Sequence, residues 1–202
     1  MTKQKNQGLA FALLAAIWIY LLGNIGGWVS PEIVFNLMGK RGFTEGVAGG
    51  GTALELPGGA LGSLGLALCA DRLPVRKLAL LSGVILVLTQ YLSGMIESTW
   101  MLLAVRFVCG LTQGLLMGVA NAVLANGRNP HARLAAANII NVLLGSALLY
   151  VLAPLQQHYS QWGLFAILAV ICLLLTPFCF DLQRTLLQHK QAPRTLGSPH
   201  AA

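Results

Sequence analysis

Charged residues are scarce in this chain. Only 9% of its 202 residues are Asp, Glu, Lys or Arg, whereas about one quarter of an ordinary soluble domain is charged. Hydrophobic residues make up 56% of the sequence, and its mean hydropathy is +0.71. This composition excludes an ordinary soluble domain and is typical of a chain whose surroundings are lipid.

Patterns that hold metals or carry out catalysis are also absent from the sequence. The cysteines form no CxxC motif and no paired spacing, and no HExxH motif occurs. The cysteines are Cys69, Cys109, Cys172 and Cys179, and the histidines, all in predicted loops or the tail, are His131, His158, His189 and His200. An intramembrane hydrolase would need a nucleophile with a base, or metal ligands, within its helices. We therefore expect no enzymatic activity, no metal and no cofactor.

What the chain does contain is a series of apolar runs. Each is about 20 residues long or longer, enough for a helix to cross a hydrocarbon layer about 30 Å thick. The predicted spans are 9–29, 43–70, 78–96, 99–125, 134–156 and 162–180. Short segments with Pro, Gly or Asn separate them, beginning with SPEIVFNLMGKRG. The predicted fold is an all-α membrane protein with six transmembrane helices in two three-helix repeats.

The basic residues predict an orientation. The formal net charge is +7, and ten of the thirteen Lys and Arg residues lie on the side that both termini share. Lys40 and Arg41 fall on the other side, and Arg106 lies within a span. Basic residues gather in cytoplasmic loops, so the excess marks topology and not nucleic-acid binding. We expect a multi-pass protein of the plasma (bacterial inner) membrane with both termini in the cytoplasm.

This orientation divides the chain into three parts. The predicted parts are a cytoplasmic N-terminus (1–8), a transmembrane domain (9–180) and a basic cytoplasmic tail (181–202). The predicted cytoplasmic loops are 71–77 and 126–133, and the predicted outer loops are 30–42 and 157–161. The first apolar run is longer than the hydrophobic region of a signal peptide, about 7–15 residues. It therefore predicts an uncleaved first helix.

Polar residues distinguish four of the spans from the other two. In the first, second, fourth and fifth spans they recur every three or four residues, which places them on one face of each helix. The third and sixth spans contain no charged residue and few polar ones beyond Ser, Thr and one Gln. We expect the four polar-faced spans to line a pathway and the other two to face lipid. The possible substrate-lining residues are Tyr20, Asn24, Trp28, Asn121, Asn138 and Asn141. Helix packing through glycines and amides is the alternative explanation.

Glu55 and Arg106 are the charged residues placed deepest in the predicted spans. At 1.5 Å per residue, Glu55 lies about 18 Å from Phe43, and Arg106 about 10 Å from Thr99. A charge near the bilayer centre costs about 2.5–3.5 kcal/mol on the mildest scale, so such residues usually pair or line a cavity. Two interpretations stay open: a structural ion pair, or a role in coupling or substrate binding together with Gln113.

Two motifs carry a resemblance to a known family. The segment ALCADRLPVRK, with Asp71, Arg72, Arg76 and Lys77, resembles the cytoplasmic loop motif of the major facilitator superfamily. The motif departs from the family pattern at three positions, namely Ala67, Pro74 and Val75. The segment RFVCGLTQG resembles the second motif of the family, matched at Arg106, Gly110, Gln113 and Gly114. Both motifs fall in the expected spans.

The resemblance implies a secondary active transporter. Members of the superfamily have twelve helices in two six-helix halves, with the substrate held between them, and this chain is similar to the amino-terminal half. The resemblance implies alternating access with proton coupling, a cytoplasmic gate at Asp71, Arg72, Arg76 and Lys77, and Arg106 near the coupling site. The implied partners are lipid, a small-molecule substrate, a proton, and a second six-helix half or a second copy. A truncated or regulatory six-helix protein without transport activity is the alternative.

Overall fold

The fold is built from helices alone in the part of the chain that the structure describes. The computed structural model describes residues 2–69, 75–125, 129–155, 162–177 and 179. The helices are α1 (Thr2–Trp28), α2 (Ser30–Gly39), α3 (Glu45–Cys69), α4 (Val75–Met95), α5 (Thr99–Ala125), α6 (Pro130–Leu155) and α7 (Gly163–Leu175). No strand occurs in these ranges, so the all-α prediction is confirmed.

The expectation of six membrane spans is met only in part. Three helical stretches are long and apolar enough to cross a membrane: Lys77–Met95, Thr99–Ala125 and Pro130–Pro154. A fourth span results if α1 and α2 count as one bent helix. The α3 helix has 25 residues but carries two acids and many glycines, and α7 has 13 residues. Helix length and hydropathy alone therefore support three or four spans in the described residues.

One predicted loop is wrong, because residues 30–39 form a helix. The α2 helix continues the direction of α1 after a bend of 40° at Val29. Pro31 occupies the first turn of α2, where a missing N–H is tolerated. The same missing N–H leaves no donor for the carbonyl four residues earlier, which favours a bend at this point. From the sequence alone this proline was expected in a loop, whereas it lies in the first turn of a second helix.

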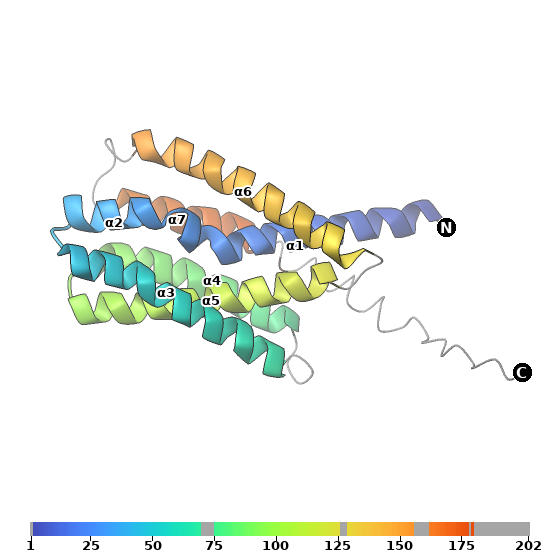
Figure 1. Ribbon diagram of the computed structural model, residues 1–202, viewed down its shortest axis with the longest axis horizontal. Helices are drawn as coiled ribbons and strands as arrows, with labels where there is room; N and C mark the ends of the chain where they lie inside the picture. The colour runs from blue at the N-terminus through green and yellow to red at the C-terminus, as the bar shows by residue number, and fades with distance from the viewer. Residues whose placement is uncertain (1, 70–74, 126–128, 156–161, 178, 180–202) are drawn as a thin grey trace, which may run out of the picture.

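When α1 and α2 are taken as one bent helix, successive described helices run in opposite directions (Figure 1). The start of α1, the end of α3 and the start of α6 lie at one end of the bundle, and the α2–α3 connection lies at the other. The α5 helix packs against α1, α3 and α4, while α7 packs mainly on α4 and α6 mainly on α1. Through these contacts α5 is the helix that joins the bundle.

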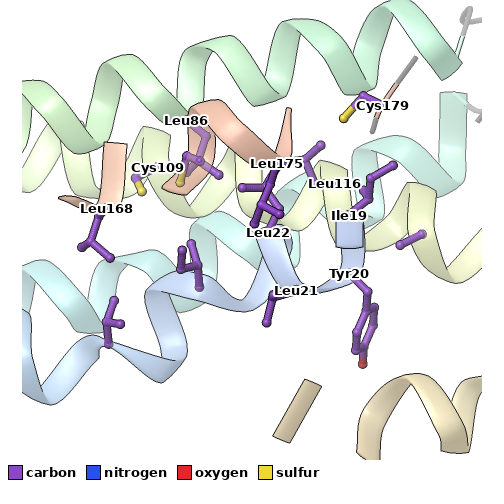
Figure 2. Packing of buried hydrophobic residues seen from close by; sticks show 14 of the residues in the cluster. Ile19, Tyr20, Leu21, Leu22, Leu86, Cys109, Leu116, Leu168, Leu175 and Cys179 are labelled. Carbon is purple, nitrogen blue, oxygen red and sulfur yellow. The ribbon is translucent and has the colours of Figure 1, made fainter. Parts of the chain in front are cut away.

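The apolar core lies between α1, α4, α5 and α7 (Figure 2). Leu22 of α1, Leu86 of α4, Leu116 of α5 and Phe165 of α7 are fully buried there. Lipid is as apolar as these side chains, so such helices are held together by close packing and not by the hydrophobic effect. This core fixes α1 and α5, the two helices that also carry the polar residues described below.

The α3 and α5 helices touch through their backbones. A Cβ atom added at Gly58 or Gly62 of α3 would overlap main-chain atoms of α5, and one added at Gly110 or Gly114 of α5 would overlap main-chain atoms of α3. Small residues allow this close approach between membrane helices. The contact brings Glu55 and Arg106 together from two separate helices.

A basic residue fastens one end of the bundle. Arg41, in the α2–α3 connection, donates hydrogen bonds to the carbonyls of Ser93 and Ile96 at the end of α4. A cation is favourable at a helix C-terminus, where unpaired carbonyls point outward. The guanidinium also lies 5.3 Å from the ring centre of Phe43. Burial lowers the pKa of Arg41, and the nearby Glu97 acts in the opposite direction.

Candidate functional site

A cavity of about 620 Å³ lies between α1, α3 and α5 and also touches the first residue of α2. Its polar side chains are amides, hydroxyls and one carboxylate: Asn24, Ser30, Thr52, Glu55, Ser63 and Gln113. Pockets of about 300–1,000 Å³ hold small molecules, usually with a few polar groups that fix the orientation of the ligand. The cavity therefore has the size and chemistry for a small polar solute.

An ion pair stands in the wall of this cavity. The carboxylate of Glu55 on α3 pairs with the guanidinium of Arg106 on α5. The Arg106 side chain is fully buried, while 8% of the Glu55 side chain is exposed and lines the cavity. Gln113, about two turns further along α5, donates a hydrogen bond of 3.2 Å from Nε2 to Oε2 of Glu55. The carboxylate is thus bound on one oxygen by a cation and on the other by an amide.

The α1 helix closes the other side of the ion pair. Gly26 lies so near that an added Cβ would overlap Oε2 of Glu55 and the amide of Gln113. Gly23 likewise lies against the main chain of α5 near Gln113. These two glycines allow α1 to pack directly over the paired side chains.

The fourth member of the network comes from a helix that the sequence analysis placed against lipid. Gln90 of α4 is fully buried, and its Oε1 accepts a hydrogen bond of 3.2 Å from an Arg106 terminal nitrogen. Sequence reasoning missed this residue. The feature that could have indicated it is the single amide side chain of the predicted third span. An amide that faced lipid would have no hydrogen-bond partner, so it is expected to face another helix.

Hydrogen bonding in the network is incomplete. Nε2 of Gln90 and Nε of Arg106 are buried and have no hydrogen-bond partner among the described residues. A buried donor without a partner costs about 1–3 kcal/mol. A buried pair is also weak evidence for stability, because desolvating two charges offsets much of their attraction. The arrangement is thus poorly explained by stability alone, which favours a functional role.

The predicted substrate-lining residues divide into two groups. Asn24 borders the cavity. Tyr20 donates a 2.8 Å hydrogen bond to Oδ1 of Asn138, and Trp28 donates one of 3.3 Å to Oδ1 of Asn141. These two bonds join α1 to α6, and none of the four residues is among those that line the cavity. Asn121 on α5, half-buried, is not among them either.

The predicted gate falls largely outside the described residues. Asp71 and Arg72 lie in the undescribed range 70–74. Arg76 belongs to the first turn of α4, and Lys77 follows it with an exposed side chain. Their role as a gate stays a prediction.

Residues 11–144, more than half of the chain, match the family described as Sugar (and other) transporter. The chain belongs to the sugar transporter family. No curated protein and no solved structure shows a significant match to it. The family assignment confirms the resemblance to the major facilitator superfamily. The matched range corresponds to part of one half of such a transporter.

Membership in the sugar transporter family places the helices in a membrane and directs attention to a transported solute. The matched range contains the whole cavity and all four members of the network, Glu55, Gln90, Arg106 and Gln113. It ends within α6, so α7 lies beyond the match. The geometry described above therefore belongs to the part of the chain that defines the family.

Proposed function

We propose that this chain forms the amino-terminal six-helix half of a secondary transporter that moves a small polar solute by alternating access, driven by a proton that binds at Glu55. The observation that carries the proposal is the position of Glu55, which lines the cavity and pairs with the buried Arg106. A titratable carboxylate in contact with both the cavity and a fixed cation can link proton binding to a change in packing.

The lining of the cavity favours a neutral, hydroxylated solute. Its polar groups are amides and hydroxyls, and Arg106 offsets the charge of Glu55. Such groups donate and accept hydrogen bonds, as the hydroxyls of a sugar require. The family description names sugars first among its substrates. Pentoses and hexoses are therefore the solutes to test.

The test uses the full chain reconstituted in liposomes. Radiolabelled glucose, galactose, xylose and arabinose are offered under an inward proton gradient, and trapped pyranine reports the internal pH. We expect accumulation of at least one sugar together with internal acidification, and loss of both when an ionophore removes the gradient. In Glu55→Gln, sugar should still move down its own concentration gradient, while accumulation driven by the proton gradient should stop.

The alternative of a six-helix protein without transport of its own makes a different prediction. Helical, monodisperse protein that neither accumulates any of the four sugars nor acidifies the liposomes would contradict transport by this chain alone or as a pair. Native-gel mass in mild detergent then distinguishes a single copy from a pair. A pair would supply a second six-helix bundle to cover the cavity, as two-fold dimers commonly do.

A further inference from the structure

The helix α4 contributes one side chain to the charged network, and this contact has a consequence for proton binding. Arg106 lies between Glu55 on α3 and Gln90 on α4, and it binds both. It is the only side chain among these three that keeps its charge in every state of the network, because a guanidinium does not lose its proton in proteins. What happens to it when Glu55 becomes neutral therefore depends on Gln90.

We propose that Gln90 is a positioning residue for proton coupling: it holds the Arg106 guanidinium in place when Glu55 takes up a proton. The inference rests on the proposed function, in which Glu55 is the proton carrier. In the step itself a hydronium ion gives up a proton, breaking one of its O–H bonds, and a new O–H bond forms on the Glu55 carboxylate while the ion pair with Arg106 is lost. No other covalent bond changes.

Burial makes a retained partner necessary. Arg106 and Gln90 are both fully buried, so water cannot replace the carboxylate when the ion pair is lost. The bond from Arg106 to Oε1 of Gln90 does not involve Glu55 and is available in both protonation states. Once Glu55 is neutral it no longer competes for the guanidinium, so the bond to Gln90 is stronger in the protonated state than in the ionised one. This difference favours protonation of Glu55.

The unused donor of Gln90 supports a role beyond packing. Nε2 of Gln90 has no hydrogen-bond partner among the described residues, so an apolar side chain of the same shape would avoid a buried, unpaired donor. The oxygen of the amide, and not its nitrogen, is the part that the network uses. A residue that only filled space would not need an amide oxygen at this position.

The groups around Glu55 limit what else can titrate there. In the described residues, α5 presents Arg106 and, beside it, the thiol of Cys109, which accepts a 3.2 Å hydrogen bond from Gln113. Cys172 of α7 interacts electrostatically with Cys109. From α1 the neighbour is Gly26, and from α4 it is Gln90. Glu55 is thus the carboxyl group that the experiment reads at this site.

The experiment follows protonation of Glu55 directly and needs no substrate. Infrared difference spectra of the full chain in lipid are recorded over a range of pH, and the carboxyl band lost in Glu55→Gln is assigned to Glu55. Gln90→Met removes the acceptor while keeping the side-chain length, and it should weaken proton binding about tenfold, the size expected for one hydrogen bond to a charged group. Gln90→Glu adds a second carboxylate beside Arg106 and should shift protonation to higher pH.

Thr89→Val is the matched control. Thr89 is the neighbouring buried polar residue of α4, and its hydroxyl donates to the carbonyl of Leu86 within the same helix. This variant should leave the protonation midpoint of Glu55 unchanged. If Gln90→Met is unfolded by circular dichroism, Gln90→Asn takes its place, because it keeps the amide but withdraws the acceptor from Arg106, and it should also weaken proton binding to Glu55.

Two results would overturn the inference, and they are distinguishable. Midpoints in folded Gln90 variants equal to that of the wild type would show that Gln90 only fills space, while the proposed function stands. A wild-type carboxyl band that does not change with pH would remove Glu55 as the proton carrier, and with it both the proposed function and the role of Gln90.

Discussion

At the scale of single residues, Glu55 and Arg106 should depend on each other for stability. Neutralising one partner of a buried pair leaves a buried charge without compensation and costs about 3–5 kcal/mol. We expect Glu55→Gln and Arg106→Gln each to lower the thermal stability in detergent, and the double variant to recover part of the loss. Residues in contact couple by about 0.5–3 kcal/mol, which a double-mutant cycle measures.

Glu45 provides a matched control for this cycle. It is an exposed acid in the first turn of the same helix, α3. Glu45→Gln combined with Arg106→Gln should give additive effects, because Glu45 lies ten residues before Glu55, about 15 Å along α3 at 1.5 Å per residue. Additive losses for Glu55 and Arg106 as well would contradict an energetic link between them.

The charged members of the site were predictable from the sequence, whereas its neutral member was not. Arg106 and Glu55 are costly in lipid wherever they lie, so their types alone marked them. Gln90 is a single amide whose helical face the sequence does not reveal. Only the packing of α4 on α5 shows that it faces Arg106.

At the scale of helices, the contact between α3 and α5 predicts opposite outcomes for two glycines of one helix. A Cβ at Gly62 would overlap the main chain of α5, while Gly65 has open space around it. Gly62→Ala should therefore destabilise the bundle by about 1–3 kcal/mol, as overpacking does. Gly65→Ala should be neutral or slightly stabilising, because alanine favours a helix over glycine.

Thermal unfolding of both variants in the same detergent tests this prediction. The two substitutions add the same methyl group to α3, so their difference isolates the contact with α5. Equal stabilities would show that the helices can separate freely, and the close approach would then not be what holds Glu55 beside Arg106.

The sequence predicted the helical period of α3 correctly but could not distinguish its faces. Glycines and polar residues recur at three- and four-residue intervals, and from the sequence alone this face could either line a pathway or pack against another helix. In the structure Gly58 and Gly62 pack on α5, while Thr52 and Ser63 border the cavity. Glu55 lies at the boundary and takes part in both. Periodicity defines a helix, but only its neighbours define what each face contacts.

At the scale of the whole molecule, the polar cavity shows how the two environments of the bundle are separated. The apolar core joins α1 and α5 to α4 and α7, while the cavity is bounded by α1, α3 and α5. The sequence indicated part of this division, since the third and sixth spans contain few polar residues beyond Ser, Thr and one Gln. It did not indicate that α6 would meet α1 through Tyr20 and Trp28 and leave the cavity to three long helices.

The predicted orientation can be tested at two exposed positions of the structure. Thr44 precedes α3, and His131 lies in the first turn of α6. Figure 1 places the starts of these two helices at opposite ends of the bundle. The excess of basic residues predicts that His131 faces the cytoplasm and Thr44 faces outward. In a background without the native cysteines, Thr44→Cys should react with an impermeant maleimide in intact cells, whereas His131→Cys should react only after permeabilisation. The reverse pattern would show that the topology is inverted, so the cavity would receive its proton from the opposite side. Electrostatic attraction to anionic lipid would then no longer explain where the basic residues lie.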